Sequence, residues 1–466
     1  MALDSIFLRK PISLEALDPR QRLKPTLTWV HLIPLGVGAI VGTGIYTLIG
    51  VGANLAGPGV IVSFLIAGAV CALAALAYAE VATVIPVSGS AYTYAYVALG
   101  EIIAWVVGWS LILEYSLVAS AVAVGWSAYA TGFLAALGVH LPAQLTAGIG
   151  AGGLVNAPAI LIIGVVAGVL SVGAREGASL NAALVGLKIA GLALFVAIAA
   201  PHFHAGNLQP FMPDGFWPHE VAGTKRGVMA AAAIIFFAFY GFDAVSTAAE
   251  ETKRPERDLP IGIIGSLGAC TVIYVAVALA AIGAMPTAHF AKSLEPLALI
   301  LRSLGHPGDA TIIGAAVVIA VPTVILAFLY GQSRIFFVMA RDGLLPRALA
   351  EVSRTGVPVR MTLVTAIAIA ALAGFAPYAE IASLANAGTL TAFIAVAAAL
   401  MALRRSHPDT PRGYRAPVAW LVGPAAIAGC LYLFASLQLK TQVFFAIWNA
   451  IGLALYFVWR AGRRSA

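Results

Sequence analysis

The segment GVGAIVGTGIY spans residues 36–46, and the segment FFAFYGFDAVS spans residues 236–246. Four glycines crowd the first segment, and Gly241 with Asp243 stands at the centre of the second. Both segments lie inside long apolar runs. Unwound backbone is tolerated at membrane depth only where it lines a cavity, so paired interruptions of this kind indicate a transporter's central site. The glycines could instead serve only close helix packing, but their matching places and Asp243 favour two interrupted helices.

The composition indicates an integral membrane protein. Of the 466 residues, 61% are hydrophobic and 10% are charged, whereas a soluble domain has about 45–50% and about 25%. A soluble enzyme is therefore excluded. The net charge of +7 does not indicate nucleic-acid binding, because the basic residues lie between apolar runs rather than on one solvated face. The three cysteines lie in apolar stretches without metal-ligand spacing, so we expect no metal, cofactor or disulfide framework.

Apolar runs of roughly 20 residues, the length that crosses a hydrocarbon core, recur along the chain. Each is expected to be helical, because lipid offers no water to the backbone amides and carbonyls. The twelve predicted spans are 30–52, 59–83, 100–134, 158–172, 178–200, 226–250, 260–285, 309–340, 359–376, 380–403, 416–437 and 441–460. With a polar, basic amino-terminal segment in the cytoplasm, most of the 27 lysines and arginines fall in cytoplasmic loops. We expect a multi-pass protein of the inner (cell) membrane with both termini cytoplasmic.

The spacing of the spans predicts an internal repeat. A shift of 199 residues carries Gly42 of span one onto Gly241 of span six, and carries spans two to five approximately onto spans seven to ten. Five helices are an odd number of crossings, so the second copy is inverted and two helices are appended. The predicted units are a cytoplasmic segment (1–28), a first repeat (29–203), an extracellular loop (204–225), a second repeat (226–403), and spans eleven and twelve with a cytoplasmic carboxy terminus (404–466).

An interruption of span one creates an anion-binding helix end. The second half of the span then begins near Thr43 and Gly44, after Gly42. Its first amides are free and carry about +0.5 of dipole charge, which suits a carboxylate.

The helix halves that end at the two interruptions suit a cation. They end near Ile40 and near Phe237, Ala238 and Tyr240, where carbonyls and the negative end of the helix dipole face the cavity. Free amides that bind an anion, next to free carbonyls that bind a cation, together recognise a zwitterion. Free α-amino acids are the commonest small molecules of that shape.

Further motifs resemble a known family. They are GAIVGTGIY (38–46), YAEVATVIPVSGSAYTYAYVALGE (78–101), WSLILEYSL (109–117), FYGFDAVSTAAEETKRPERDLP (239–260) and YGQSRIFFVMARDGLLP (330–346). In these segments the chain resembles the amino acid, polyamine and organocation permease superfamily, close to its cationic amino-acid transporter branch and to twelve-span bacterial members. The resemblance implies an all-α leucine-transporter-like fold of two inverted five-helix repeats plus two helices. It also implies alternating access around discontinuous spans one and six.

Lys188 stands near the middle of predicted span five, where a charge costs at least about 2.5–3.5 kcal/mol. A structural ion pair is the alternative to a functional role. In similar proton-coupled permeases, a lysine at this place occupies the position that sodium holds in sodium-coupled relatives. We therefore expect its ammonium to bridge carbonyls at the span-one break and a hydroxyl of span eight, with Thr323 as the candidate. Proton loss would loosen that bridge. A fixed cation there argues against sodium coupling.

Other polar and aromatic residues are expected near the centre. Glu114 and Asp243 are expected either as polar support or in a direct role, because both are costly at depth. Phe242 and Phe328, with Phe237 and Tyr240, are expected to line the pocket or a gate, although aromatics at helical spacing also serve as core. Separately, Glu80, Glu250 and Glu251 are expected to be conformational anchors.

Rival classes fit less well. An intramembrane enzyme needs a nucleophile or a metal constellation, yet neither HExxH nor GxSxG is present. A channel would show repeated pore loops or charged rings, which the predicted layout lacks. The expected function is therefore amino-acid transport by proton symport.

The sequence constrains the substrate and the partners less than it constrains the fold. The resemblance implies arginine, lysine or ornithine as substrates, by transport or exchange. Bulky Tyr240 instead favours small neutral amino acids, and we slightly favour these as substrates. Heterodimeric relatives attach a single-span glycoprotein through a cysteine in the loop after span three. Residues 135–157 contain no cysteine, so that disulfide linkage is not expected, and a non-covalent partner stays open. Expected partners are therefore the substrate, protons and membrane lipid.

Overall fold

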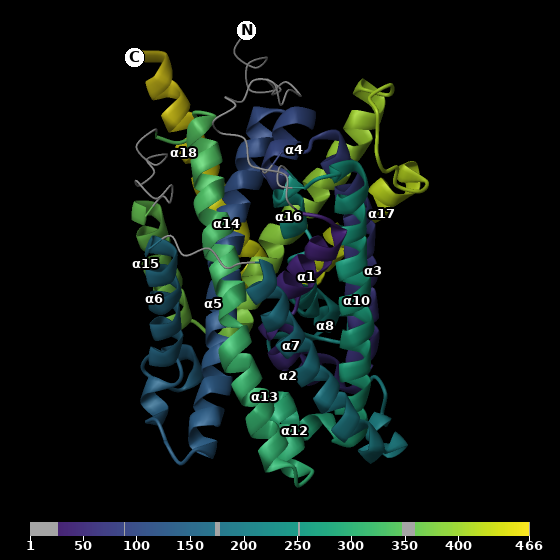
Figure 1. Cartoon of the computed structure of the whole chain (residues 1–466), viewed down its shortest axis with the longest axis vertical. Helices are drawn as coiled ribbons and strands as arrows, with labels where there is room; N and C mark the ends of the chain where they lie inside the picture. The colour runs from purple at the N-terminus through teal and green to yellow at the C-terminus, as the bar shows by residue number, and fades with distance from the viewer. Residues whose placement is uncertain (1–26, 88, 173–177, 250–251, 347–358, 466) are drawn as a thin grey trace.

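The chain folds into a bundle of long helices with α4 at one end and α12 at the other (Figure 1). The computed structural model describes residues 27–465 except 88, 173–177, 250–251 and 347–358. Most of the predicted segment 1–28, and the predicted anchors Glu250 and Glu251, thus lie outside the described residues. The helices are α1 (Trp29–Ile40), α2 (Thr43–Ala56), α3 (Val60–Val84), α4 (Ser90–Ala98), α5 (Glu101–Ala136), α6 (Ala157–Val172), α7 (Ala178–Ala199), α8 (Val228–Ile235), α9 (Ala244–Thr247), α10 (Pro255–Ala284), α11 (Thr287–Phe290), α12 (Pro296–Ser303), α13 (Pro307–Ala320), α14 (Pro322–Arg341), α15 (Val359–Phe375), α16 (Tyr378–Ser406), α17 (Ala419–Ser436) and α18 (Leu439–Ser465).

The predicted spans coincide with helices. Within the described residues, nine helical stretches are long and apolar enough to cross a membrane, judged by length and composition. Three shorter apolar helices, α1, α6 and α15, fall within predicted spans one, four and nine. The all-helical membrane fold is therefore confirmed, while the count of twelve crossings and the inverted repeat stay predictions. A short hairpin of β1 (His219–Val221) and β2 (Thr224–Arg226) precedes α8.

Predicted span eight consists of two helices, α13 and α14, that meet at Pro322. Proline has no N–H, so the carbonyl of Val318, four residues earlier, loses its helical partner. The indole of Trp126 in α5 donates to that carbonyl at 3.0 Å. A side chain of the neighbouring helix thus satisfies a backbone group that has no water available.

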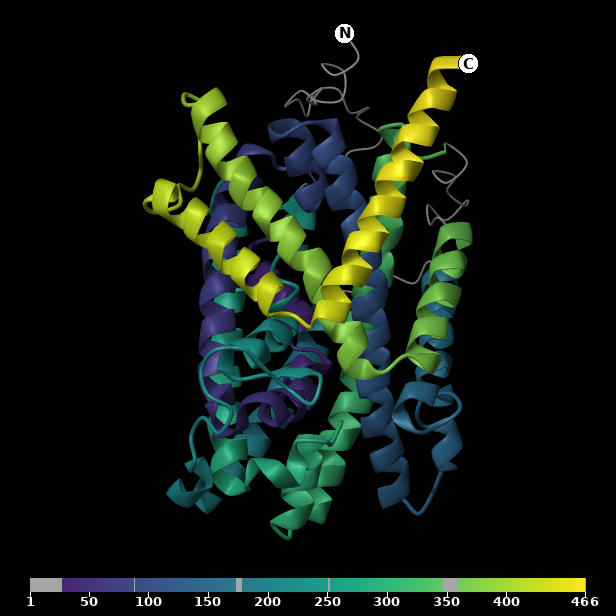
Figure 2. The same cartoon turned by 180° about the vertical axis from the view of Figure 1, so that it is seen from behind.

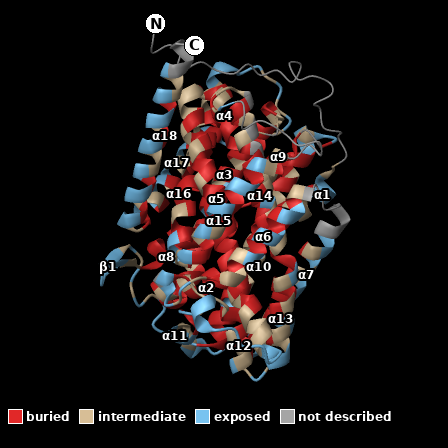
Figure 3. Cartoon of the chain, turned by 90° about the vertical axis from the view of Figure 1, so that its left-hand side faces the viewer, coloured by how far each residue is buried: buried red, intermediate tan, exposed pale blue. Residues whose placement is uncertain are grey.

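The long helix α5 is the central element, with α13, α14, α15 and α16 packed against it. Buried residues fill the centre of the bundle, whereas α18 runs along the outside with many exposed residues (Figure 3). Figure 2 shows α17 and α18 together on that outer side. Two tryptophans attach α18 to α5, because the indoles of Trp109 and Trp448 each donate to the other's backbone carbonyl, at 2.9 and 3.1 Å.

A buried ion cluster ties α3 to the loop after α16. Glu80 of α3 is only 1% exposed. Its carboxylate accepts two hydrogen bonds from the Arg404 guanidinium, at 2.8 and 2.6 Å, and one from the Ala416 amide at 2.7 Å. Arg412 forms a further ion pair with it at 3.1 Å. The loop is thereby held against the end of α3, which agrees with an anchoring role for Glu80.

We predict that Glu80→Gln markedly destabilises the protein. Removing one charge of a buried ion pair costs about 3–5 kcal/mol, because the partner charges stay buried without compensation. Thermal unfolding of purified protein in detergent measures the effect. The matched control is Glu380→Gln, because Glu380 pairs with Lys440 at an exposed site, where such a pair contributes about 0–1 kcal/mol. Equal melting temperatures for the two variants would contradict the assignment.

Candidate functional site

The first predicted interruption is present in the structure. Helix α1 ends at Ile40 and α2 begins at Thr43. Between them the backbone leaves the helical region, with ψ 81° at Val41 and ψ −152° at Gly42. No side chain caps α2 at Gly42. The first amides of α2 therefore lack the usual side-chain acceptor, and the positive end of its dipole lies at the break.

The second interruption is present as well. Helix α8 ends at Ile235 and continues as a short 3-10 segment over Phe236–Phe239. Tyr240 is then extended, and Gly241 has φ +109°, a conformation that favours glycine. The Asp243 carboxylate accepts a hydrogen bond from the Gly241 amide at 3.2 Å. Asp243 thus holds the turn between the two helical parts of span six.

The two interruptions contact each other through glycine on both sides. A Cβ at Gly44 would lie 2.6 Å from the Cα of Ala238, and a Cβ at Gly241 would lie 2.6 Å from the carbonyl carbon of Ala39. Such distances leave no space for any side chain. The start of α2 therefore lies against the 3-10 segment, and the turn at Gly241 lies against the end of α1.

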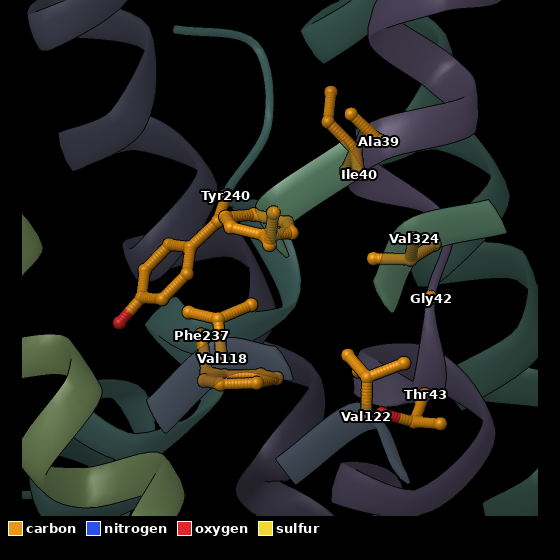
Figure 4. A pocket seen from close by; sticks show the side chains of 11 residues that line it. Ala39, Ile40, Gly42, Thr43, Val118, Val122, Phe237, Tyr240 and Val324 are labelled. Carbon is orange, nitrogen blue, oxygen red and sulfur yellow. The ribbon is translucent and has the colours of Figure 1, made fainter. Parts of the chain in front are cut away.

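A small cavity lies where the interruptions meet (Figure 4). It has about 10 Å³ of space, room for about one water molecule. Its lining comes from α1, α2, α5, α14 and the 3-10 segment, and comprises Ala39, Ile40, Gly42, Thr43, Gly44, Val118, Val122, Phe237, Tyr240, Val324 and Phe328. The cavity is therefore too small for an amino acid in this structure.

Seven of the nine residues expected at the substrate site line the cavity. The two others, Ala238 and Phe242, do not. The Ala238 backbone packs against Gly44, and the Phe242 ring packs against Tyr78 and Phe393 with centroid distances of 5.8 and 5.1 Å.

Sequence reasoning missed Ala39 and the three lining valines, Val118, Val122 and Val324. Val118 and Val122 are one turn apart on α5, so they share one helical face. In an apolar helix, the sequence pattern of valines at this spacing is the same whether they face lipid or a cavity.

The carbonyls at the helix ends are largely occupied. The Ile40 carbonyl accepts hydrogen bonds from the Tyr274 hydroxyl at 2.9 Å and from the Gly42 amide at 2.8 Å. The expectation of a free Ile40 carbonyl is therefore not met. Near the end of α8, the Asn386 amide donates to the carbonyls of Ala233 at 2.6 Å and Ile234 at 3.2 Å.

Lys188 connects α7 to both halves of span one. Its side chain is 1% exposed, and its ammonium donates to the Gly38 carbonyl and the Thr323 hydroxyl, each at 3.0 Å. Its own backbone carbonyl accepts the Tyr46 hydroxyl of α2 at 2.8 Å. Thr323 is the hydroxyl expected from the sequence, and the carbonyl is that of Gly38 in the last turn of α1 rather than one at the break itself.

Glu114 lies one turn from Val118 on α5 and is buried. Its side chain lies beside Thr389 of α16, which also neighbours Tyr240. One oxygen of Glu114 has no hydrogen-bond partner within the described part of the chain. Glu114 and Asp243 are thus placed around the cavity rather than in its wall.

Comparison with known proteins identifies the class. A family model described as amino acid permease matches residues 27–459, and the chain belongs to this family of membrane transporters. The resemblance found in the motifs is thereby confirmed.

Three relatives cover most of the chain. A branched-chain amino acid permease of Bacillus subtilis is 45% identical over 462 residues, 98% of this chain and 97% of the relative. A methylthioribose transporter of the same organism is 41% identical over 462 residues, 98% of each. A vacuolar cationic amino acid transporter of Arabidopsis thaliana is 36% identical over 402 residues, 84% of this chain and 65% of the relative.

We predict that Gly44→Ala impairs both folding and transport. The added methyl would enter the Ala238 backbone, and overpacking of this kind costs about 1–3 kcal/mol. Thermal unfolding and substrate uptake into proteoliposomes provide the two measurements. The control is Gly168→Ala in α6, where nothing lies within 4 Å of the added Cβ. Wild-type uptake by Gly44→Ala would refute the close contact of the two interruptions.

Proposed function

We propose that the protein is a secondary active transporter that carries neutral amino acids across the cell membrane by alternating access, together with protons. The observation that carries the proposal is the contact of two interrupted helices at a buried cavity lined largely by backbone and apolar side chains. Both termini lie in the cytoplasm in this proposal. In this proposal, the inverted repeats within the twelve crossings allow the central site to open alternately to each side of the membrane.

In this proposal the backbone recognises the groups common to all α-amino acids. The uncapped start of α2 at Gly42, Thr43 and Gly44 receives the α-carboxylate. The ammonium lies near the carbonyl end of the 3-10 segment, around Phe237. This end is preferred because the Ile40 carbonyl already accepts two hydrogen bonds, whereas the Phe237 carbonyl accepts one, from the Tyr240 amide at 3.5 Å. Because the cavity is too small for an amino acid, substrate entry requires the surrounding helices to move apart.

The cavity wall favours an apolar substrate side chain. None of its lining residues ionises in the physiological range, and three of them are valines. A cationic side chain would meet no carboxylate in the wall, since Glu114 lies a turn away. The similarity to a branched-chain amino acid permease points the same way. Cationic amino acids, or a neutral sugar as the methylthioribose relative suggests, are the alternatives.

Proton coupling is assigned to Lys188. Its charged ammonium joins Gly38 of α1 to Thr323 of α14. A neutral amine has two hydrogens instead of three and lacks the charge that strengthens both bonds. Proton loss toward the cytoplasm would therefore weaken the link between these helices and favour their separation.

A thermal-shift screen of purified protein against the twenty amino acids tests the proposed substrate class. A ligand that binds only the folded state stabilises it by about 2.7 kcal/mol at one hundred times its Kd. We expect leucine, isoleucine, valine and alanine to raise the melting temperature, and lysine and arginine not to. A shift with lysine or arginine alone would establish the cationic alternative, and no shift with any amino acid would contradict the proposal.

We predict that Lys188→Ala still binds amino acid but no longer accumulates it against a gradient. Without the ammonium, the link between α1 and α14 is absent at any pH, so proton binding can no longer strengthen it. Uptake into liposomes under an imposed pH gradient is the measurement, with Lys440→Ala at an exposed ion pair as the control. Accumulation by Lys188→Ala that still followed the pH gradient would show that the coupling site lies elsewhere.

A further inference from the structure

The first turn of α2 holds a buried hydroxyl at the cavity. Thr43 is the first residue of this fourteen-residue helix. Its side chain is fully buried and lines the cavity, and in Figure 4 its oxygen points toward Val122. Within the described residues, this oxygen has no hydrogen-bond partner. Buried polar atoms are nearly always paired, so the exception requires an explanation.

A second buried hydroxyl lies beside the first. Tyr378 is the first residue of α16 and is 5% exposed. Its hydroxyl lies beside that of Thr43, and no other polar group in the part of the chain that the structure describes bonds it.

Other tyrosines around span one behave differently. Tyr46, Tyr129 and Tyr274 each donate to a backbone carbonyl, at 2.8, 2.7 and 2.9 Å. These three hydroxyls are satisfied, whereas those of Tyr378 and of Tyr240 in the cavity wall have no hydrogen-bond partner by distance and angle within the described residues.

The donors at this place fit one kind of ligand group. The first amides of α2 are not capped by a side chain, and the hydroxyls of Thr43 and Tyr378 add two further donors. A carboxylate has two oxygens with about four acceptor positions, and hydrogen bonds to a charged group are the stronger ones. A group of neutral charge would leave part of this donor set and the helix dipole without a partner.

We propose that Tyr378 is a substrate ligand whose hydroxyl, with that of Thr43, donates a hydrogen bond to the substrate's α-carboxylate at the start of α2. This inference rests on the proposed amino-acid transport and adds α16 to the elements that contact substrate. The carboxylate then joins α2 to α16, so its binding favours the conformation in which these two helices lie together.

The test compares leucine with leucinamide, which replaces the carboxylate by a neutral amide. Affinities are measured by titration calorimetry on the full-length protein in lipid nanodiscs. Tyr378→Phe removes only the hydroxyl, and a hydrogen bond to a charged group contributes enough that leucine affinity should fall at least about tenfold. Leucinamide affinity should change by less than about threefold, because it presents no charged acceptor. Thr43→Val, which keeps the side-chain shape, should show the same selective loss.

Tyr94→Phe is the matched control, because the Tyr94 hydroxyl is also buried without a hydrogen bond within the described residues but belongs to α4. Its affinities should equal those of wild type. Unchanged leucine affinity in Tyr378→Phe, or equal losses for leucine and leucinamide, would overturn the inference. If Tyr378→Phe does not fold, Thr43→Val decides by the same criterion. Failure of the wild type to bind any amino acid would instead refute the proposed function.

Discussion

The structure depends on one contact, the crossing of two interrupted helices whose backbones touch through Gly44 and Gly241. An interrupted helix at membrane depth exposes amides and carbonyls that lipid cannot satisfy. The surrounding helices satisfy some of them. Tyr274 bonds the end of α1, and Asn386 bonds the last turn of α8. The start of α2 is left without a side-chain cap, and that is where the proposed substrate's negative end binds.

Lys188 of α7 bonds both halves of span one near this central contact. Lys188 bonds α1 through its ammonium and α2 through its backbone carbonyl, and it reaches Thr323 just after the proline that separates α13 from α14. A change at the ammonium therefore acts on the first half of span one and on span eight together. In the proposed function, proton binding and helix movement are linked at this place.

The two interruptions and Lys188 could be predicted because glycine clusters and charged residues are unusual in the middle of a membrane-spanning helix. Glycines crowded at mid-span predicted the interruptions, and the cost of a buried charge singled out Lys188. The features that could not be predicted depend on which face of an apolar helix turns inward. Val118 and Val122 resemble lipid-facing valines, and Phe242 turned out to pack behind the cavity. Neither Asn386 nor Tyr378 carries a sequence signal of its own, since the residues that they lie against are far away in the chain.

The most direct test of this account is a cryo-electron microscopy structure of the protein in lipid nanodiscs with leucine at saturating concentration. The account predicts that residues 41–42 and 240–243 are non-helical. It also predicts density for one leucine between them, with its carboxylate at the first amides of α2 and its side chain against Val118 and Val122. Continuous helices through both segments, or leucine bound elsewhere while this cavity stays closed, would contradict it.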